Sequence, residues 1–148
     1  YFPYTPSTNI LYGLDEALSM LLDEGLANVF ERHRRLAYAT QLAVAGWGLE
    51  NLCVNPEEYS NSTTAVLMPE GHDADALRNI ILEKFNMSLG MGLGKVKGTV
   101  FRIGHIGDFN ELMMAGTLSG VEMGLSIARV PHTKGGVNAA LEFLASSA

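Results

Sequence analysis

Residues 99–105 read Thr-Val-Phe-Arg-Ile-Gly-His, and this stretch decides how the middle of the chain is interpreted. Valine, phenylalanine, isoleucine and threonine are all enriched in β-strands. Successive side chains of a strand point to opposite faces of its sheet. If Phe101 and Ile103 face a hydrophobic core, Arg102 faces the other way. The stretch therefore predicts a strand at Thr99–Ile103 that carries a guanidinium group on its outer face.

Further strands and a helix are predicted upstream of this stretch. Residues 63–68 (Thr-Thr-Ala-Val-Leu-Met) are β-branched and apolar and stop at Pro69, which is typical of a strand. A short strand is expected around Leu49–Val54. Asp73 can cap a helix that runs to about Phe85, because a carboxylate accepts hydrogen bonds from the first free amides of a helix.

Helical patterns occupy both ends of the chain. Near the N-terminus, apolar residues recur at steps of three and four, which places them on one stripe of a helix: Leu11, Leu14, Leu18, Leu21 and Leu22. Gly25 interrupts this pattern, which resumes as far as Val44, so we expect two helices or one helix bent at Gly25. Near the C-terminus, helices are predicted from Phe109 to about Ile127 and over Val137–Leu144.

The order of these elements predicts an α+β fold, with adjacent strands joined by short links and the helices grouped on one face. The chain has 148 residues, which suits one compact domain or a piece of a larger one. Its 47% hydrophobic content is typical of a globular protein. No run of about 18 apolar residues predicts a membrane span. The net charge of −6 argues against a nucleic-acid partner, and the single cysteine, Cys53, fits a reducing cytoplasm.

Arg102 is the one candidate for binding an anion. A guanidinium at the end of a rigid strand, followed by Gly104, can hold a carboxylate through two parallel hydrogen bonds. A solvated arginine on an outer face explains the same pattern, and spacing alone favours that alternative because most arginines are exposed. From the residues alone, both interpretations stay open.

Other motifs give no positive signal. The histidines, His33, His72, His105 and His132, have no metal-ligand spacing with one another or with Cys53, so no metal site is predicted. His105 would lie near a site if Arg102 does; otherwise all four are expected in loops and on the surface. The glycine-rich segment 88–98 fails the patterns of phosphate-binding and dinucleotide-binding loops, so a flexible connection between strands is favoured.

Four blocks of sequence, in order and at matching spacing, resemble the C-terminal portion of serine–glyoxylate aminotransferases. These enzymes belong to the class V group of fold-type-I pyridoxal-phosphate enzymes. The blocks are Pro3-Tyr-Thr-Pro-Ser7 with Leu11-Tyr-Gly-Leu14, Ser88-Leu-Gly-Met-Gly-Leu-Gly94, Phe101-Arg-Ile-Gly-His-Ile-Gly107 and Leu118-Ser-Gly-Val-Glu-Met123. The resemblance covers essentially the whole chain. It implies a small C-terminal domain with a short, mostly antiparallel sheet and helices on one face, preceded by a long connecting helix.

The resemblance implies roles for two residues. Arg102 matches the arginine that grips the α-carboxylate of the amino-acid or 2-oxo-acid substrate. Thr5 matches a threonine that lies near the phosphate of the pyridoxal 5'-phosphate cofactor and reaches it from the neighbouring subunit of a homodimer. The alanine–glyoxylate relatives have a tyrosine three residues before that threonine, where this chain has Phe2, which carries no hydroxyl group.

The resemblance also implies what the chain lacks. The catalytic lysine of the family follows a serine in a Ser-x-Lys context upstream of Thr5, and no lysine of this chain stands in that context. No catalytic residue is therefore expected here. We expect residues 1–45 to form the N-terminal segment and long helix, and residues 46–148 the small domain. The small domain would work with the large domain of the same protein to transfer an amino group from serine or alanine to glyoxylate. The alternative is a stand-alone domain that binds small carboxylates without catalysis.

Overall fold

The computed structural model describes residues 2–147. The first residue of the expected segment 1–45, Tyr1, and the last residue of the expected domain 46–148, Ala148, lie outside the described residues. Within this range the chain packs as two compact units, with the boundary in the sequence between Arg32 and His33. Among residues 2–147, none of the helices has both the length and the hydropathy that a membrane span requires.

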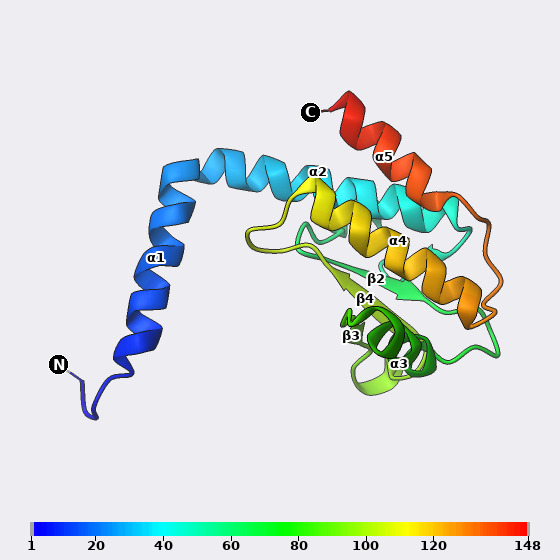
Figure 1. Ribbon diagram of the computed structural model, residues 1–148, viewed down its shortest axis with the longest axis horizontal. Helices are drawn as coiled ribbons and strands as arrows, with labels where there is room; N and C mark the ends of the chain where they lie inside the picture. Colours follow the sequence, from blue (N-terminus) through cyan, green and yellow to red (C-terminus); the bar gives the residue numbers. More distant parts are fainter. Residues whose placement is uncertain (1, 148) are drawn as a thin grey trace. The chain divides into compact units, whose positions relative to one another are not determined.

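Two helices account for the N-terminal pattern. Helix α1 spans Thr8–Glu24 and helix α2 spans Leu26–Gly46 (Figure 1). Gly25 separates them with a φ angle of 83°, a left-handed conformation that glycine adopts without the steric cost of a Cβ atom. The predicted interruption at Gly25 is confirmed. Helix α1 buries none of its residues, so its leucine stripe is solvent-exposed in the described chain.

The second unit contains a four-stranded antiparallel sheet with the strand order β1-β2-β4-β3 (Figure 1). The strands are β1 (Glu50–Asn51), β2 (Thr63–Leu67), β3 (Gly90–Met91) and β4 (Val100–Gly104). The helices are α3 (Ala74–Phe85), α4 (Glu111–Ile127) and α5 (Gly136–Ser146), with short 3₁₀ turns at Pro56–Glu58 and Gly94–Val96. The paired strands β2 and β4 form the centre of the sheet.

One face of the sheet forms the core with the helices. Val66 pairs with Phe101 and Thr64 with Ile103, and all four side chains are buried. They meet apolar residues from the second half of α2 and from α3, α4 and α5: Leu36, Ala39, Ala43, Val44, Leu77, Ile81, Met114, Leu118, Val121, Leu125, Ala140 and Leu144. Burying this surface drives the folding of the unit. The predicted α+β architecture, with helices on one face of a mostly antiparallel sheet, is confirmed.

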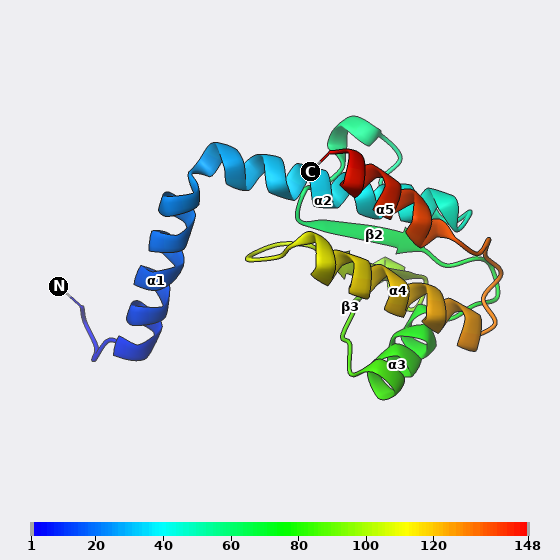
Figure 2. The ribbon, with the colours of Figure 1, turned by 45° about the horizontal axis from the view of Figure 1, so that its top comes forward.

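Helices α2 and α5 lie side by side (Figure 2), and glycines allow their close approach. A Cβ atom added to Gly46 would lie 2.8 Å from the Cα atom of Gly136. A Cβ atom on Gly136 would lie 2.4 Å from the ring of Trp47, which is fully buried. The α2–α5 contact therefore requires glycine at position 136.

Local boundaries differ from the predicted ones in two places. The strand expected within residues 49–54 is only the two-residue β1, because the chain then turns away into the 3₁₀ turn that Asn55 caps. The glycine-rich segment is more regular than the flexible connection we expected. It contains the edge strand β3 and a 3₁₀ turn, and Gly92 donates to the carbonyl of Val100 at 3.0 Å.

Candidate functional site

Arg102 lies on the face of the sheet opposite the core. Its neighbours Phe101 and Ile103 are fully buried, whereas Arg102 itself is partly exposed. The predicted alternation along β4 is therefore confirmed. A guanidinium keeps its charge in any protein environment, so this side chain presents a permanent cation on the outer face.

The neighbours of Arg102 on this face are small. In the register of the sheet, Arg102 stands opposite Ala65 of β2 on one side and Gly90 of β3 on the other. Gly104, two residues along β4, leaves open space where a Cβ atom would be. No bulky side chain from these positions covers the guanidinium, so a small anion can approach it.

One hydrogen bond and one close contact hold the arginine side chain. Its Nε atom donates to the backbone carbonyl of Met91 at 2.9 Å. Gly90 lies beneath it, since a Cβ atom added there would lie 3.1 Å from both the Cβ and Nε atoms of Arg102. Among the described residues, no hydrogen bond or ion pair engages the two terminal nitrogens. The N–H groups of these two nitrogens are therefore available to donate hydrogen bonds to a ligand.

His105 lies at the end of the strand that carries Arg102. It is fully buried, which corrects the expectation that histidines outside the site would be in loops on the surface. Its Nδ1 atom donates to the carbonyl of Asn61 at 3.1 Å, so Nε2 accepts the hydroxyl hydrogen of Thr64 at 3.0 Å. Burial lowers the pKa of His105 to about 4, so His105 is neutral in the folded chain at neutral pH.

This buried histidine fixes the end of β4 to the start of β2. Its backbone amide donates to Ser62 at 3.0 Å, in addition to the two ring hydrogen bonds. Two residues further on, the amide of Gly107 donates to Nε2 of His33 on α2 at 3.1 Å. The segment that follows Arg102 is thus held by hydrogen bonds of the His105 ring and of the backbone amides of His105 and Gly107. This role could not be predicted, because one amino-acid sequence does not distinguish a buried histidine from a surface histidine.

Thr5 lies in the irregular segment before α1, and its side chain is exposed. Phe2 is exposed as well. Thr5 belongs to the first compact unit and Arg102 to the second. The exposed hydroxyl of Thr5 is free to donate to a phosphate oxygen, but one hydroxyl alone does not make a phosphate site.

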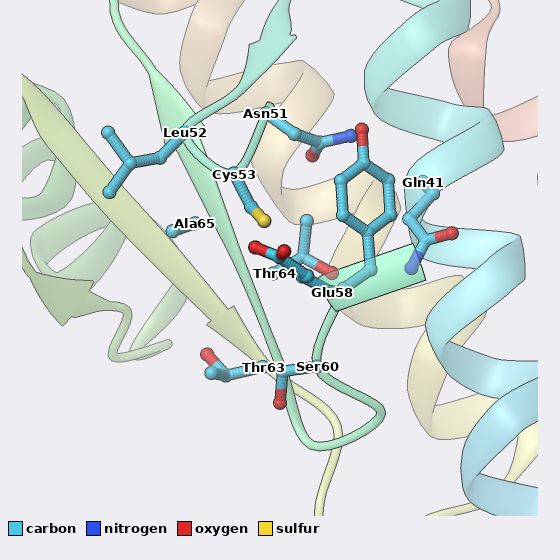
Figure 3. A pocket seen from close by; sticks show the side chains of 10 residues that line it. Gln41, Asn51, Leu52, Cys53, Glu58, Ser60, Thr63, Thr64 and Ala65 are labelled. Carbon is cyan, nitrogen blue, oxygen red and sulfur yellow. The ribbon is translucent and has the colours of Figure 1, made fainter. Parts of the chain in front are cut away.

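A hollow lies beside β1 and the start of β2, next to Gln41 of α2. It has a volume of about 240 Å³, and Figure 3 shows Asn51, Cys53 and Thr64 turned towards Gln41 of α2. The Oδ1 atom of Asn51 is buried and has no hydrogen-bond partner among the described residues. Ala65, which stands opposite Arg102 in the sheet register, is one of the residues that line the hollow, whereas Arg102 itself does not line it. Within residues 2–147, no group of three or more histidine, cysteine or acidic side chains could hold a metal ion.

Glu122 is a structural residue that the sequence did not single out. Its carboxylate accepts hydrogen bonds from Nε1 of Trp47 at 2.7 Å and from the amides of Gly135 and Val137 at 2.8 and 3.1 Å. Burial raises the pKa of this carboxyl group, but these hydrogen bonds and His132 outweigh burial and lower the pKa below its ordinary value. Glu122 thus joins α4 to the end of α2 and the start of α5.

Comparison with known proteins identifies close relatives. The chain is 50% identical over 145 residues to a serine–glyoxylate aminotransferase of Methylorubrum extorquens and 49% identical over 146 residues to one of Arabidopsis thaliana. Each match covers 97% of this chain and 36% of the relative, so the chain spans about a third of these proteins. No protein-family model matches the chain.

A solved structure agrees with this relationship. The crystal structure of pyridoxamine–pyruvate aminotransferase from Mesorhizobium loti superimposes with a TM-score of 0.93 at 32% sequence identity. The match covers 100% of this chain and 38% of that one. The second unit and the helices before it therefore have the fold of a part of an aminotransferase.

Proposed function

Since the chain belongs to the family of the serine–glyoxylate aminotransferases and spans about a third of their length, we propose that it is the C-terminal, substrate-gripping part of such an enzyme. The parent protein would use pyridoxal 5'-phosphate to transfer an amino group from serine or alanine to glyoxylate. The chain by itself would not catalyse this reaction. The proposal extends to the whole protein an activity named for relatives of which this chain covers 36%.

Arg102 carries the proposal. Its terminal nitrogens have no partner among the described residues, its neighbours on the outer face are Ala65 and Gly90, and its Nε atom is already held by a backbone carbonyl. A planar guanidinium matches the two oxygens of a carboxylate, and both substrates of the proposed reaction carry one. Arg102 would therefore bind and orient the amino acid and the 2-oxo acid in turn.

The four lysines of the chain do not fit the role of the catalytic lysine. Lys84, Lys95, Lys97 and Lys134 are all exposed, and none stands in a Ser-x-Lys context. When bound, the cofactor supplies an electron sink for negative charge that develops next to the substrate carboxylate. We assign to this chain only Thr5 as a contact of the cofactor phosphate, with the remaining contacts in the rest of the parent.

The N-terminal part of the chain fits a connecting role. We propose that residues 1–45 link the small domain to a large domain of the same protein, although the last turns of α2 already pack into the core of the second unit. The leucine stripe of α1 is exposed in the described chain, and apolar surface of this kind marks a contact with another part of a protein. We further propose a homodimeric parent in the cytoplasm.

Substitution of Arg102 in the full-length protein tests the proposal. Two charge-assisted hydrogen bonds contribute together about 3–5 kcal/mol, so Arg102→Ala should lower kcat/KM for serine and glyoxylate roughly 100- to 5000-fold. Arg102→Lys keeps the charge but loses the planar fork, and should recover only part of the loss. Unchanged kcat/KM in Arg102→Ala would refute the assignment.

The cofactor spectrum separates an enzyme from a binding module. The full-length protein with pyridoxal 5'-phosphate should show an absorbance band that bleaches on adding serine and returns on adding glyoxylate. A protein that binds small carboxylates without catalysis would bind glyoxylate through Arg102 and show no such cycle.

A further inference from the structure

We propose that Gly90 is a positioning residue for the substrate carboxylate, because the missing side chain at this position lets Arg102 lie across the edge strand and present its two terminal nitrogens together. This inference rests on the proposed function of Arg102 and adds a binding mode to it. It assigns a specific task to one glycine of the segment that the sequence suggested was a flexible connection.

The backbone of Gly90 does not by itself require glycine. Gly90 is absent from the residues with positive φ angles, although seven other glycines of the described chain have them. Its strand is two residues long and lies at the edge of the sheet, where a glycine weakens the strand. The reason for glycine at this position is therefore the space above it, which the side chain of Arg102 fills.

The contacts of Arg102 select one way of binding a carboxylate. Its Nε–H group points at the carbonyl of Met91 at 2.9 Å and is not available to a ligand. The guanidinium is planar, so the donors that stay free are those of the two terminal nitrogens. A carboxylate would therefore bind end-on, with one oxygen at each terminal nitrogen, and not side-on against Nε.

A side chain at position 90 would push against the Arg102 side chain near its base and so displace the guanidinium at its end. A Cβ atom there would lie 3.1 Å from both Cβ and Nε of Arg102 and 3.5 Å from Cζ. Arg102 would have to move by a few tenths of an ångström near Nε to relieve the contact. The Nε–Met91 hydrogen bond would then bend or break, and the terminal nitrogens, further from the backbone, would move most. The expected effect is weaker substrate binding without loss of the fold.

The test uses the full-length protein and four variants: Gly90→Ala, Arg102→Ala, the double variant, and Gly116→Ala as a matched control. Gly116 lies in α4, and a Cβ atom there would meet no atom within 4 Å. Five quantities are measured for each: KM and kcat with serine and glyoxylate, the dissociation constant of glyoxylate for the cofactor-free protein by calorimetry, the cofactor spectrum and Tm.

Loss of one charge-assisted hydrogen bond predicts that Gly90→Ala raises KM for both substrates, and the dissociation constant of glyoxylate, about tenfold. We expect kcat to stay within about threefold, and the spectrum and Tm to match those of Gly116→Ala. In the Arg102→Ala background, Gly90→Ala should add less than about twofold, because its effect acts through the arginine.

The other outcomes overturn the inference in distinguishable ways. If Arg102→Ala lowers kcat/KM strongly but Gly90→Ala leaves KM and the dissociation constant unchanged, Gly90 does not position the arginine and the proposed function stands. If Gly90→Ala lowers Tm, kcat and cofactor binding together, its role is structural. If Arg102→Ala itself has no effect on kcat/KM, the proposed function fails, and this inference fails with it.

Discussion

The buried histidine at the end of β4 should make the stability of the chain depend on pH between about 4 and 6.5. Burial lowers the pKa of His105 from its ordinary value of 6.5 to about 4. Between these two values the unfolded chain binds a proton at this position and the folded chain does not. As far as His105 is concerned, the free energy of unfolding therefore has its maximum value above about pH 6.5 and decreases as the pH is lowered towards 4.

The magnitude follows from the pKa difference. At about 1.4 kcal/mol for each pH unit, the folded chain should lose about 3 kcal/mol between pH 7.5 and pH 4 because of His105 alone. A domain of this size is stable by about 5–15 kcal/mol, so the effect is a large fraction of the total. His105→Asn keeps a donor for the carbonyl of Asn61 but does not titrate, so this part of the pH dependence should disappear.

Urea unfolding of the chain at a series of pH values measures this effect. Trp47 is the only tryptophan and is fully buried, so its fluorescence reports unfolding of the second unit. Thr64→Val serves as the matched control, because it removes the hydroxyl group that donates a hydrogen bond to His105 but leaves the histidine buried. Thr64→Val should lower the free energy of unfolding by about 1 kcal/mol at every pH and retain most of the dependence of that free energy on pH. If His105→Asn retains the full slope from pH 6.5 to 4, the reasoning is wrong.

The remaining predictions concern the packing around α4 and α5. Glu122→Gln should destabilise the chain by roughly 1–3 kcal/mol at pH 7, since it weakens the hydrogen bonds from Trp47, Gly135 and Val137; urea unfolding measures this. Because the folded-state pKa of Glu122 is lowered, its stabilisation is present above the ordinary carboxyl pKa and is lost as the pH falls through the folded-state value, so the variant and the wild type should converge in acid. Gly136→Ala should lower the free energy of unfolding by about 1–3 kcal/mol or more, because its Cβ atom would lie 2.4 Å from the ring of Trp47. An equal loss in Gly116→Ala, where alanine has free space and a higher helix propensity, would show that crowding is not the cause.

Local chemistry made several parts of the fold predictable. The break at Gly25 follows from the end of one helical stripe at a residue that tolerates a φ angle of 83°. The start of α3 follows from Asp73, whose carboxylate accepts from the amide of Asp75 at 2.8 Å. The outward direction of Arg102 follows from the two-residue period of a strand. Each of these depends on a few neighbouring residues, so a single chain contains the necessary information.

Strand β3 could not be predicted in the same way. It consists of Gly90 and Met91, neither of which favours a strand, and it forms because β4 offers a row of unpaired backbone groups. The expected strand within residues 49–54 was too long for a related reason. Its length is set by how far it can pair with β2, and that pairing stops where the chain turns at Asn55.

The sequence by itself determined the order of the helices and of strands β1, β2 and β4, the α+β class, the outer-face arginine and, through four blocks of resemblance, the family. Only the tertiary structure decided that His105 is buried and neutral, that Glu122 joins three helices, and that Gly90 and the carbonyl of Met91 hold Arg102. The physical reason is the distance along the chain between the partners. A residue's backbone preference is set by its neighbours, whereas its burial, its pKa and the space around it are set by residues that only folding brings together, such as Trp47 and Glu122, which are 75 positions apart.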